Sequence, residues 1–194
     1  MQLQLCALLF IHSILYKGFL CLGNSGAGKS TLSSKLLQMG IQVHNDDICI
    51  IDVENNKILP SIPYIKLWLN SLKNLNCKTD DYFPVHPGAE KFIFPIENYK
   101  KETVNISQIY QLVLKGSSKT SITEISNHTD CFLTLFNNLY LKQLLKYKDI
   151  ASNHFCLLKK FTDKNLIFRA ERGNNVSSDS FLFDFFSYFD EVSA

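Results

Sequence analysis

The sequence is poor in arginine: Arg169 and Arg172 are the only two, and nearly all of its basic residues are lysines. Its 20 basic residues are almost balanced by 18 acidic ones, so the formal net charge is +2 at pH 7. Nucleic acids and acidic membrane surfaces attract strongly basic proteins, and this charge balance gives no sign of either. We therefore expect no nucleic-acid partner and no membrane partner.

Paired cysteine motifs are also absent. The six cysteines are scattered, and no two of them form a C-x-x-C pair. This pattern argues against a metal site and a disulfide framework, and it favours a reducing cytoplasm. An apolar stretch over residues 3–15 has no basic region before it, is interrupted by His12, and is too short to span a bilayer. We expect a buried pair of strands there, and a cytoplasmic protein.

The chain does have enough residues to build a core. It contains 194 residues, of which 46% are hydrophobic and 20% charged, as in ordinary globular proteins. We find no internal repeat and no low-complexity linker that would divide it. We expect one domain over residues 1–194.

A glycine-rich stretch, Gly23–Ser30, matches the phosphate-loop pattern G-x-x-x-x-G-K-[ST] at every fixed position. Glycines let the backbone wrap around a phosphate, Lys29 can reach the β- and γ-phosphates, and the Ser30 hydroxyl can bind Mg²⁺. A strand is predicted just before the loop, over residues 19–22, and a helix just after it, over residues 29–39, ended by Gly40. The N-terminus of such a helix favours an anion. The predicted nucleotide-binding residues are Gly23, Asn24, Ser25, Gly26, Ala27, Gly28, Lys29, Ser30 and Thr31.

Two adjacent carboxylates form the second informative feature. Asp46 and Asp47 follow a predicted strand over residues 41–44, which we expect to lie beside the strand that precedes the loop. Adjacent side chains of an extended chain point in opposite directions, so one carboxylate can face a metal and the other an acceptor hydroxyl. Phosphoryl transfer needs both functions. Asp52, at the end of a predicted strand over residues 48–53, is a competing metal ligand, although the turn after it explains this residue equally well.

The remaining pattern predicts an α/β fold whose strands form a meander, without regular β-α-β alternation. Further strands are predicted over residues 5–15, 58–59, 91–96, 106–114, 120–125 and 165–169. Further helices are predicted over residues 65–75, 129–145, 151–161 and 180–192, the last of them capped by Asp179. Residues 77–88 are predicted to form a loop, and residues 16–18 and 116–118 to form turns.

The segment GNSGAGKSTLSSKLLQMG, followed by HNDD, resembles the catalytic domain of bacterial HPr kinase/phosphorylase. It is more similar still to the small HPr-kinase-like serine kinases of ribosomal-peptide biosynthesis, including lasso-peptide kinases. Weaker similarities extend over nearly the whole chain, at residues 60–68, 88–91, 108–110, 131–140 and 153–155. The resemblance implies a P-loop domain with the loop at the centre of a mixed sheet, of the type shared with phosphoenolpyruvate carboxykinase.

The resemblance also implies a function, an ATP- and Mg²⁺-dependent kinase that phosphorylates a serine of a peptide or small protein. Lys29 and Ser30 would serve ATP and Mg²⁺, Asp46 would help to hold the metal, and Asp47 would be the general base. Relatives carry a catalytic histidine on the strand before the strand of the loop, where position 8 of this chain is leucine. We expect His12 to take that place if the hairpin is two residues shorter on each strand, because this shortening preserves the face of the strand.

Alternatives remain open at the level of the sequence. Relatives usually have more sequence upstream, so a truncated, inactive kinase and a nucleotide-binding accessory protein are alternatives to an active kinase. Nothing in the sequence separates a peptide acceptor from a small molecule. The acceptor, the direction of phosphate transfer and the oligomeric state, for which a homo-oligomer stays open, are not encoded in any motif that we find.

Overall fold

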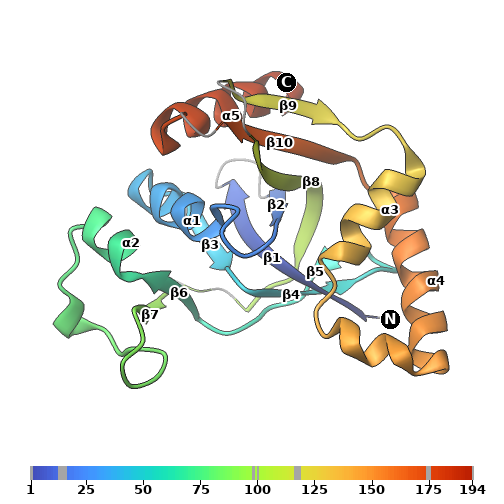
Figure 1. The fold of residues 1–194 in the computed structure, drawn as a ribbon, viewed down its shortest axis with the longest axis horizontal. Helices are drawn as coiled ribbons and strands as arrows, with labels where there is room; N and C mark the ends of the chain where they lie inside the picture. Colours follow the sequence, from blue (N-terminus) through green and yellow to red (C-terminus); the bar gives the residue numbers. More distant parts are fainter. Residues whose placement is uncertain are drawn as a thin grey trace.

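The computed structural model describes residues 2–12, 17–97, 99, 101–115, 119–173 and 176–193. These residues form an eight-stranded mixed sheet and a separate two-stranded ribbon, with helices on both faces of the sheet (Figure 1). The mixed α/β class predicted from the sequence is therefore confirmed. The predicted turn over residues 116–118 and the predicted end of the first strand, residues 13–15, lie outside the described residues.

The strands and helices are numbered in the order in which they occur along the chain. The strands are β1 (Gln2–His12), β2 (Lys17–Leu22), β3 (Gln42–Asn45), β4 (Ile48–Asp52), β5 (Lys57–Ile58), β6 (Tyr64–Trp68), β7 (Lys91–Pro95), β8 (Val104–Lys115), β9 (Ser121–Glu124) and β10 (Ile167–Gly173). The helices are α1 (Lys29–Gln38), α2 (Leu69–Asn74), α3 (His128–Asn137), α4 (Lys148–Lys164) and α5 (Ser178–Ser193), with short 3₁₀ helices η1 (Thr79–Asp81) and η2 (Lys142–Lys146).

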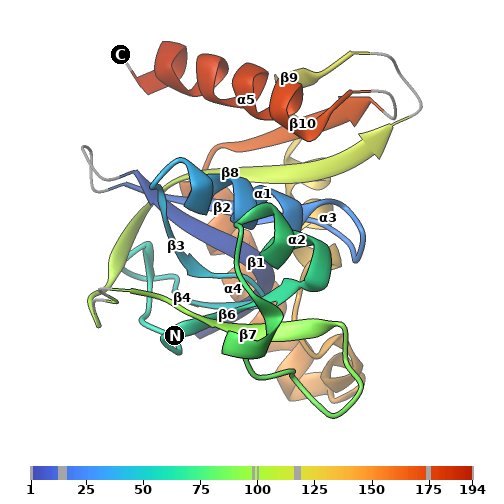
Figure 2. The ribbon, with the colours of Figure 1, turned by 90° about the vertical axis from the view of Figure 1, so that its left-hand side faces the viewer.

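Five strands of the sheet, including β1 and β2 of the N-terminal hairpin, pair in a closed ring. β2 pairs with β1 on one side and with β8 on the other, and β1, β4, β5 and β8 complete the ring. The pairs β2–β8 and β8–β10 are parallel, whereas β1 is antiparallel to β2, β3 and β4. β10 and β9 extend the sheet beyond β8, beneath α5 (Figure 2). The strand before the phosphate loop, β2, thus lies between two other strands.

The sequence predicted that β3 lies beside β2, and this prediction is wrong. β3 pairs with β1, so that β1 separates it from the strand of the loop. β4 pairs with the same edge of β1 nearer the N-terminus, from Gln2 to Cys6. The chain therefore leaves β1 and returns to it between Asn45 and Ile48, where residues 46 and 47 form a bend.

Apolar side chains fill both faces of the sheet. On one face, Leu5 and other odd-numbered residues of β1 pack with Leu135 of α3 and Phe161 of α4. On the other face, Phe10 and Phe19 stack with ring centroids 5.3 Å apart, in a core that includes residues of α1 and α5. No helix in the described part of the chain combines the length and the apolarity needed to cross a bilayer.

Part of the predicted helix over residues 65–75 is a strand. Ile65 and Leu67 are buried and alternate with Lys66 and Trp68, which is the two-residue period of a strand. β6 pairs with β7 in antiparallel register, and Trp68 lies opposite Lys91. Only residues 69–74 are helical, as α2. The error placed Lys66 and Trp68 on a helix, whereas they share one face of a ribbon.

The predicted helix over residues 129–145 is broken after Asn137. The next residues pair with the edge of β1 instead: Cys6 N donates to Asn138 O at 2.8 Å, and Tyr140 N donates to Gln4 O at 3.0 Å. The chain then passes through the left-handed conformation at Leu141, with φ of 54°, before η2 begins. Tertiary pairing overrides the helical periodicity here, and it brings the end of α3 to the phosphate loop.

Gly18 was placed in a turn by the sequence pattern, but it lies within β2, packed against β8. A Cβ added there would lie 2.7 Å from Val104 Cγ1 and 3.1 Å from the Asn105 carbonyl oxygen. We predict that Gly18→Ala lowers the free energy of unfolding by about 1–3 kcal/mol, the usual cost of overpacking. Urea unfolding tests this. Val104→Ala should recover part of the loss in the double variant, and equal stability of Gly18→Ala and wild type would contradict the packing.

Candidate functional site

The loop between β2 and α1 has the geometry of an anion cradle. Residues 24–27 form a tight turn, in which Ala27 N donates to Asn24 O at 3.1 Å. Gly26 and Gly28 have φ of 84° and 98°, values that glycine adopts without strain. No described residue accepts a hydrogen bond from the N–H groups of Gly26, Gly28 or Lys29. These N–H groups lie at the N-terminus of α1, where the helix dipole favours negative charge.

The start of the loop is fixed by close packing and by one buried side chain. A Cβ added at Gly23 would lie 2.9 Å from Ala27 Cβ and 3.1 Å from Leu112 O, so only glycine fits. Gly23 N donates to the Asn138 side-chain oxygen at 3.1 Å, and the Asn138 amide donates to Thr134 O at 2.8 Å. Asn138 therefore ties the loop to the end of α3, over a separation of 115 residues.

Lys29 lies across the loop from the first turn of α1. Its ammonium donates to Gly23 O at 2.5 Å and to Asn24 O at 3.1 Å. Burial lowers the pKa of Lys29, and the charges of Cys6, Asp47 and Asp46 offset part of this effect. The lysine is thus held at the loop, where a bound polyphosphate would replace carbonyl oxygens as its partner.

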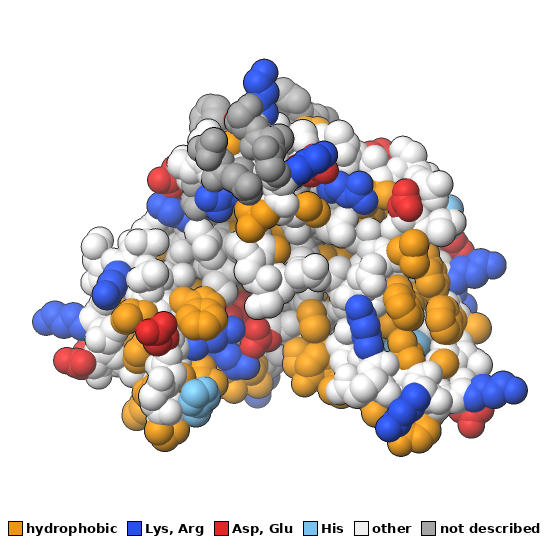
Figure 3. Space-filling model, viewed as in Figure 1, with side chains coloured by type: hydrophobic (Ala, Val, Ile, Leu, Met, Phe, Trp, Pro, Cys, Tyr) orange, Lys and Arg blue, Asp and Glu red, His pale blue; other side chains and the backbone are white. Residues whose placement is uncertain are grey.

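Two open cavities meet at the loop, which forms the wall between them. The first, of about 580 Å³, is bounded by the loop, the Asp46–Asp47 bend, the β6–β7 ribbon and the end of α3. The second, of about 720 Å³, lies on the β8 side and is bounded by residues 111–114 and by Lys142. Figure 3 shows this face hollowed between the β6–β7 side and the α3–α4 side, with basic and acidic side chains gathered on the β6–β7 wall.

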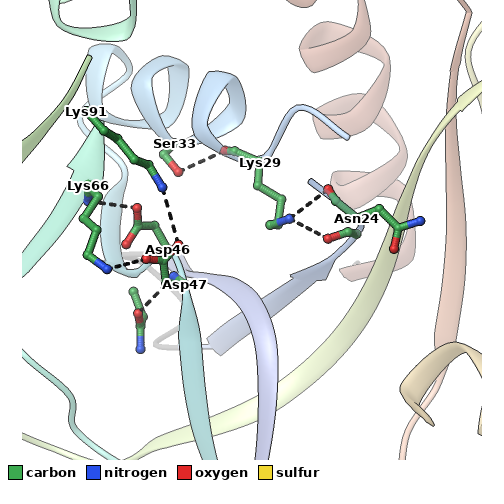
Figure 4. Close-up of polar contacts among 9 residues, drawn as sticks. Asn24, Lys29, Ser33, Asp46, Asp47, Lys66 and Lys91 are labelled. Atoms are coloured by element: carbon green, nitrogen blue, oxygen red, sulfur yellow. Dashed lines mark hydrogen bonds and ion pairs between the residues drawn. The ribbon is translucent and has the colours of Figure 1, made fainter. Parts of the chain in front are cut away.

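The bend between β3 and β4 brings Asp46 and Asp47 into the first cavity. Ala7 N donates to Asp47 O at 3.1 Å, and Ala7 lies opposite Leu22, the last residue before the loop. The two aspartates thus lie two strand positions from the loop, roughly 10 Å at the usual strand spacing. Both carboxylates point toward Lys66 and do not diverge to opposite faces as predicted (Figure 4).

The two carboxylates are held in different ways. Asp46 is buried, and its Oδ2 accepts a hydrogen bond from the backbone N of Lys66 at 2.8 Å. Asp47 is half-buried and forms ion pairs with Lys66 Nζ at 2.7 Å and with Lys91 Nζ at 3.6 Å. The first cavity is therefore bordered by two carboxylates, those of Asp46 and Asp47, and by three ammonium groups, those of Lys29, Lys66 and Lys91.

These environments shift the two pKa values in opposite directions. Burial, together with the charge of Asp47, raises the pKa of Asp46 to about 6. Burial also acts to raise the pKa of Asp47, but the hydrogen bond from Lys66 and the charges of Lys91 and Lys66 outweigh it and lower the pKa. Asp47 is consequently ionised at neutral pH. The raised pKa of Asp46 means that its ionised form is disfavoured, and a bound cation would stabilise that form.

The donor atoms present fit a magnesium ion bound together with phosphates. Ser30 and Asp46 border the same cavity, and no described residue donates a hydrogen bond to Asp46 Oδ1. The described residues contain no cluster of three or more His, Cys, Asp or Glu side chains that could hold a metal alone. Mg²⁺ commonly takes one or two protein ligands and fills its shell with phosphate oxygens and water.

Two residues are not brought to the loop: the predicted catalytic His12 and Asp52, which the sequence offered only as a competing metal ligand. Asp52 lies at the far end of β4 and accepts hydrogen bonds from Glu54 N and Asn55, as a turn residue does. The backbone of His12 pairs with Lys17 at the closed end of the hairpin, five positions beyond Ala7, or roughly 17 Å along the strand. The hairpin register places Leu8, and not His12, opposite Cys21 near the start of the loop, and a catalytic role of His12 stays a prediction.

Sequence reasoning missed four residues that border the site: Lys66, Trp68, Lys91 and Asn138. Trp68 is 50% exposed, and Lys91 Nζ lies 5.8 Å from its ring centroid. The alternation of Ile65, Lys66, Leu67 and Trp68 would have revealed two of the four, had that segment been interpreted as a strand. No local signal distinguishes Asn138, whose role depends on a distant contact.

Comparison with known proteins gives limited similarity. No family model matches the chain. The HPr kinase/phosphorylase of Mycoplasmopsis pulmonis (strain UAB CTIP) is 29% identical over 110 residues, which cover 53% of this chain and 35% of that protein. The matched part thus spans about a third of the length of this curated relative. The similarity supports a distant HPr-kinase-like relationship.

The buried carboxyl of Asp46 predicts a pH-dependent cost to stability. Its pKa in the folded protein, about 6, exceeds the ordinary value of 3.8, so the fold favours the protonated form. The free energy of unfolding should fall as pH rises between about pH 4 and pH 6, and it should stay lower above that range. With metal and nucleotide removed, Asp46→Asn should be more stable than wild type near neutral pH, by up to about 3 kcal/mol.

Chemical unfolding with a chelator present, at acidic and neutral pH, measures this difference. Asp52→Asn is the matched control, because that carboxylate lies in an exposed turn and has a lowered pKa, owing first to its hydrogen bond from Asn55. The stability gain of Asp46→Asn should vanish below about pH 4. If Asp46→Asn is less stable than wild type at neutral pH, burial of the ionised Asp46 carboxylate does not destabilise the fold.

Proposed function

We propose that this protein is an ATP- and Mg²⁺-dependent kinase that transfers a phosphoryl group to a serine hydroxyl of a peptide or small protein. The observation that carries the proposal is the cavity in which the phosphate loop and the Asp46–Asp47 bend face each other. A phosphate loop alone indicates nucleotide binding. An ionised carboxylate in the same cavity, held by two lysines, adds a group that can accept the proton of a hydroxyl.

The two cavities suggest how nucleotide and acceptor share the site. The loop separates them, so a polyphosphate bound along the loop would reach both. We place the nucleoside on the β8 side, which has no carboxylate wall, and the acceptor on the side of Asp47. The β6–β7 ribbon, with Lys66, Lys91 and Trp68, then forms the wall against which the acceptor lies.

The chemical step follows from the positions of the charged groups. The serine oxygen attacks the γ-phosphorus, the bond from that phosphorus to the bridging oxygen breaks, and ADP leaves. Asp47 accepts the proton of the hydroxyl, while Lys29 exchanges the loop carbonyls for phosphate oxygens. Lys66 and Lys91 hold Asp47 ionised and in place before the acceptor enters. Phosphoryl transfer depends mainly on such positioning and charge stabilisation.

Magnesium enters the proposal through two side chains. Ser30 and Asp46 would hold the ion, which neutralises charge on the phosphates when bound. The buried Asp46 carboxylate is oriented by the backbone of β6, so the ribbon that borders the acceptor side also positions the metal ligand. His12 has no part in this scheme, because its backbone lies at the other end of the hairpin.

The distant relative supports the kinase class and no more than that. That protein is an HPr kinase/phosphorylase, and the matched segment is about a third of its length. The P-loop fold of that family agrees with the mixed sheet and with the central position of β2. The serine acceptor rests on the resemblance of the loop and Asp-Asp segments to HPr-kinase-like serine kinases.

Nucleotide binding should depend on Lys29. Lys29→Ala removes the cation at the loop, and we expect ATP affinity to fall at least tenfold, or about 1.4 kcal/mol. Isothermal titration with Mg²⁺ and ATP measures this. Lys35→Ala is the matched control, because Lys35 lies on the same helix and pairs with Asp179 outside both cavities. Equal affinity in Lys29→Ala and wild type would remove the phosphate loop from the proposal.

Phosphate transfer should depend on Asp47. Asp47→Asn keeps the size of the side chain and removes the base, so transfer to serine peptides should fall by about 10²–10⁴-fold, while ATP affinity changes little. Incorporation of labelled phosphate into a peptide library measures the rate, with ATP titrations on the same samples. Asp52→Asn should leave both unchanged.

Three outcomes separate the alternatives. If wild type binds Mg-ATP and labels no peptide but labels a small hydroxyl compound, the acceptor class is wrong. If it binds Mg-ATP and labels nothing, the protein is a nucleotide-binding accessory protein. If Asp47→Asn transfers phosphate as fast as wild type, Asp47 is not the base.

A further inference from the structure

An apolar surface lies on α3, η2 and α4, beside the candidate site. Five large apolar side chains there are 38–53% exposed: Leu133, Leu141, Leu144, Tyr147 and Phe155. Together with the half-buried Phe132 and Phe136, they form a surface that we call the aromatic patch. Figure 3 shows hydrophobic side chains gathered over α3 and α4. Large apolar groups gathered on one surface in this way are typical of interaction sites.

The aromatic rings of the patch are ordered against one another. Phe155 of α4 stacks with Phe132 and Phe136 of α3, with ring centroids 5.8 and 5.7 Å apart and interplanar angles of 6° and 16°. Three stacked rings from two packed helices form a rigid surface, which a ligand can cover with little loss of side-chain entropy.

Two lysines lie over aromatic rings of the patch. Lys142 Nζ lies 5.7 Å from the Phe136 ring centroid, and Lys146 Nζ lies 5.1 Å from that of Tyr147. Within the described part of the chain, neither ammonium has a carboxylate partner. The patch therefore presents two ammonium groups, those of Lys142 and Lys146, with which carboxylates of a ligand can pair.

The patch is continuous with the proposed active site. Asn137, Asn138 and Tyr140, at the end of α3, border the cavity that contains Asp47. Lys142 belongs to both surfaces, because it borders the β8-side cavity and lies over Phe136. A chain that leaves the acceptor side past Tyr140 meets the patch next.

We propose that the aromatic patch docks the phosphate acceptor through a segment outside its serine, in which apolar residues alternate with acidic ones. This inference rests on the proposed function, and it names the class of acceptor: a peptide or protein with an acidic, apolar docking segment. Docking at a second surface raises the local concentration of the serine at Asp47 without new contacts in the cavity. The apolar residues would cover the stacked rings, and the acidic ones would pair with Lys142 and Lys146.

A second copy of this chain fits the patch less well. In a symmetric dimer the same surface would face itself, and the lysines of the two copies would meet. Like charges at the rim oppose such an association, whereas they favour an acidic peptide.

The test uses a fluorescent sixteen-residue probe peptide in which Leu and Phe alternate with Glu, with one serine at its end. Anisotropy without nucleotide measures binding, so this result is independent of phosphate transfer. We expect wild type to bind the probe and Leu133→Ser/Phe155→Ser to bind it at least tenfold more weakly, or about 1.4 kcal/mol. Lys146→Glu should weaken binding of this probe and strengthen that of a version with Lys in place of Glu.

Phe83→Ser is the matched control, because Phe83 is 79% exposed on the loop between α2 and β7, remote from the patch in sequence. Its affinity for the probe should equal that of wild type. Leu133→Ser alone guards against loss of fold in the double variant, and ATP affinity should be unchanged in every patch variant. In transfer assays, the patch variants should raise KM for the long peptide, leave kcat unchanged, and leave a short serine peptide unaffected.

Several results would overturn the docking proposal. It fails if wild type does not bind the probe, if the Lys version binds as well as the Glu version, or if the patch variants bind like wild type. It also fails if wild type sediments as a dimer that Leu133→Ser dissociates, since a second copy then covers the patch. A protein that binds the probe but transfers no phosphate would keep the docking surface and disprove the kinase instead.

Discussion

The site depends on the division of one strand edge. β1 pairs with β2 along one edge, while its other edge is shared by β3 and β4, with the Asp46–Asp47 bend between them. Because Ala7 lies opposite Leu22 and binds the backbone of Asp47, a single strand joins the phosphate loop to the carboxylates. A continuous β3–β4 strand would leave no bend and would point alternate side chains into the core. The interruption is what exposes two adjacent carboxylates to one cavity.

The charges around the cavity depend on one another. Asp46 is buried against the backbone of Lys66, and Asp47 pairs with the side chain of the same lysine. β6 thus holds both carboxylates, and it assigns them different pKa values by burying one and pairing the other. Because burial raises the pKa of Asp46, its ionised form opposes the stability of the fold unless a cation offsets the charge. The ribbon that forms this arrangement is separate from the main sheet.

The sequence predicted what depends on local pattern. The loop, α1, its glycine stop and the aspartate pair follow from residues within one stretch of chain, where motif and periodicity agree. The helix predicted over residues 65–75 was wrong for β6, because short apolar runs fit either period. The helix over residues 129–145 was wrong after Asn137, because residues 138–140 pair with β1. Asn138, Lys91 and the register of His12 depend on contacts between distant segments, which no local pattern contains.

The ring of strand pairs has a consequence for how the protein is made. β2, which leads into the loop, is flanked by β8, and their pairing joins residues 18–22 to residues 106–111. Gly23 is also bound by Asn138. During synthesis the ribosome releases the loop long before either partner, and such long-range pairing is slow because loop closure precedes any gain in contacts. The nascent chain therefore fixes the loop that begins at Gly23 only after most of its length has been translated, so an ordered loop reports completion of the fold.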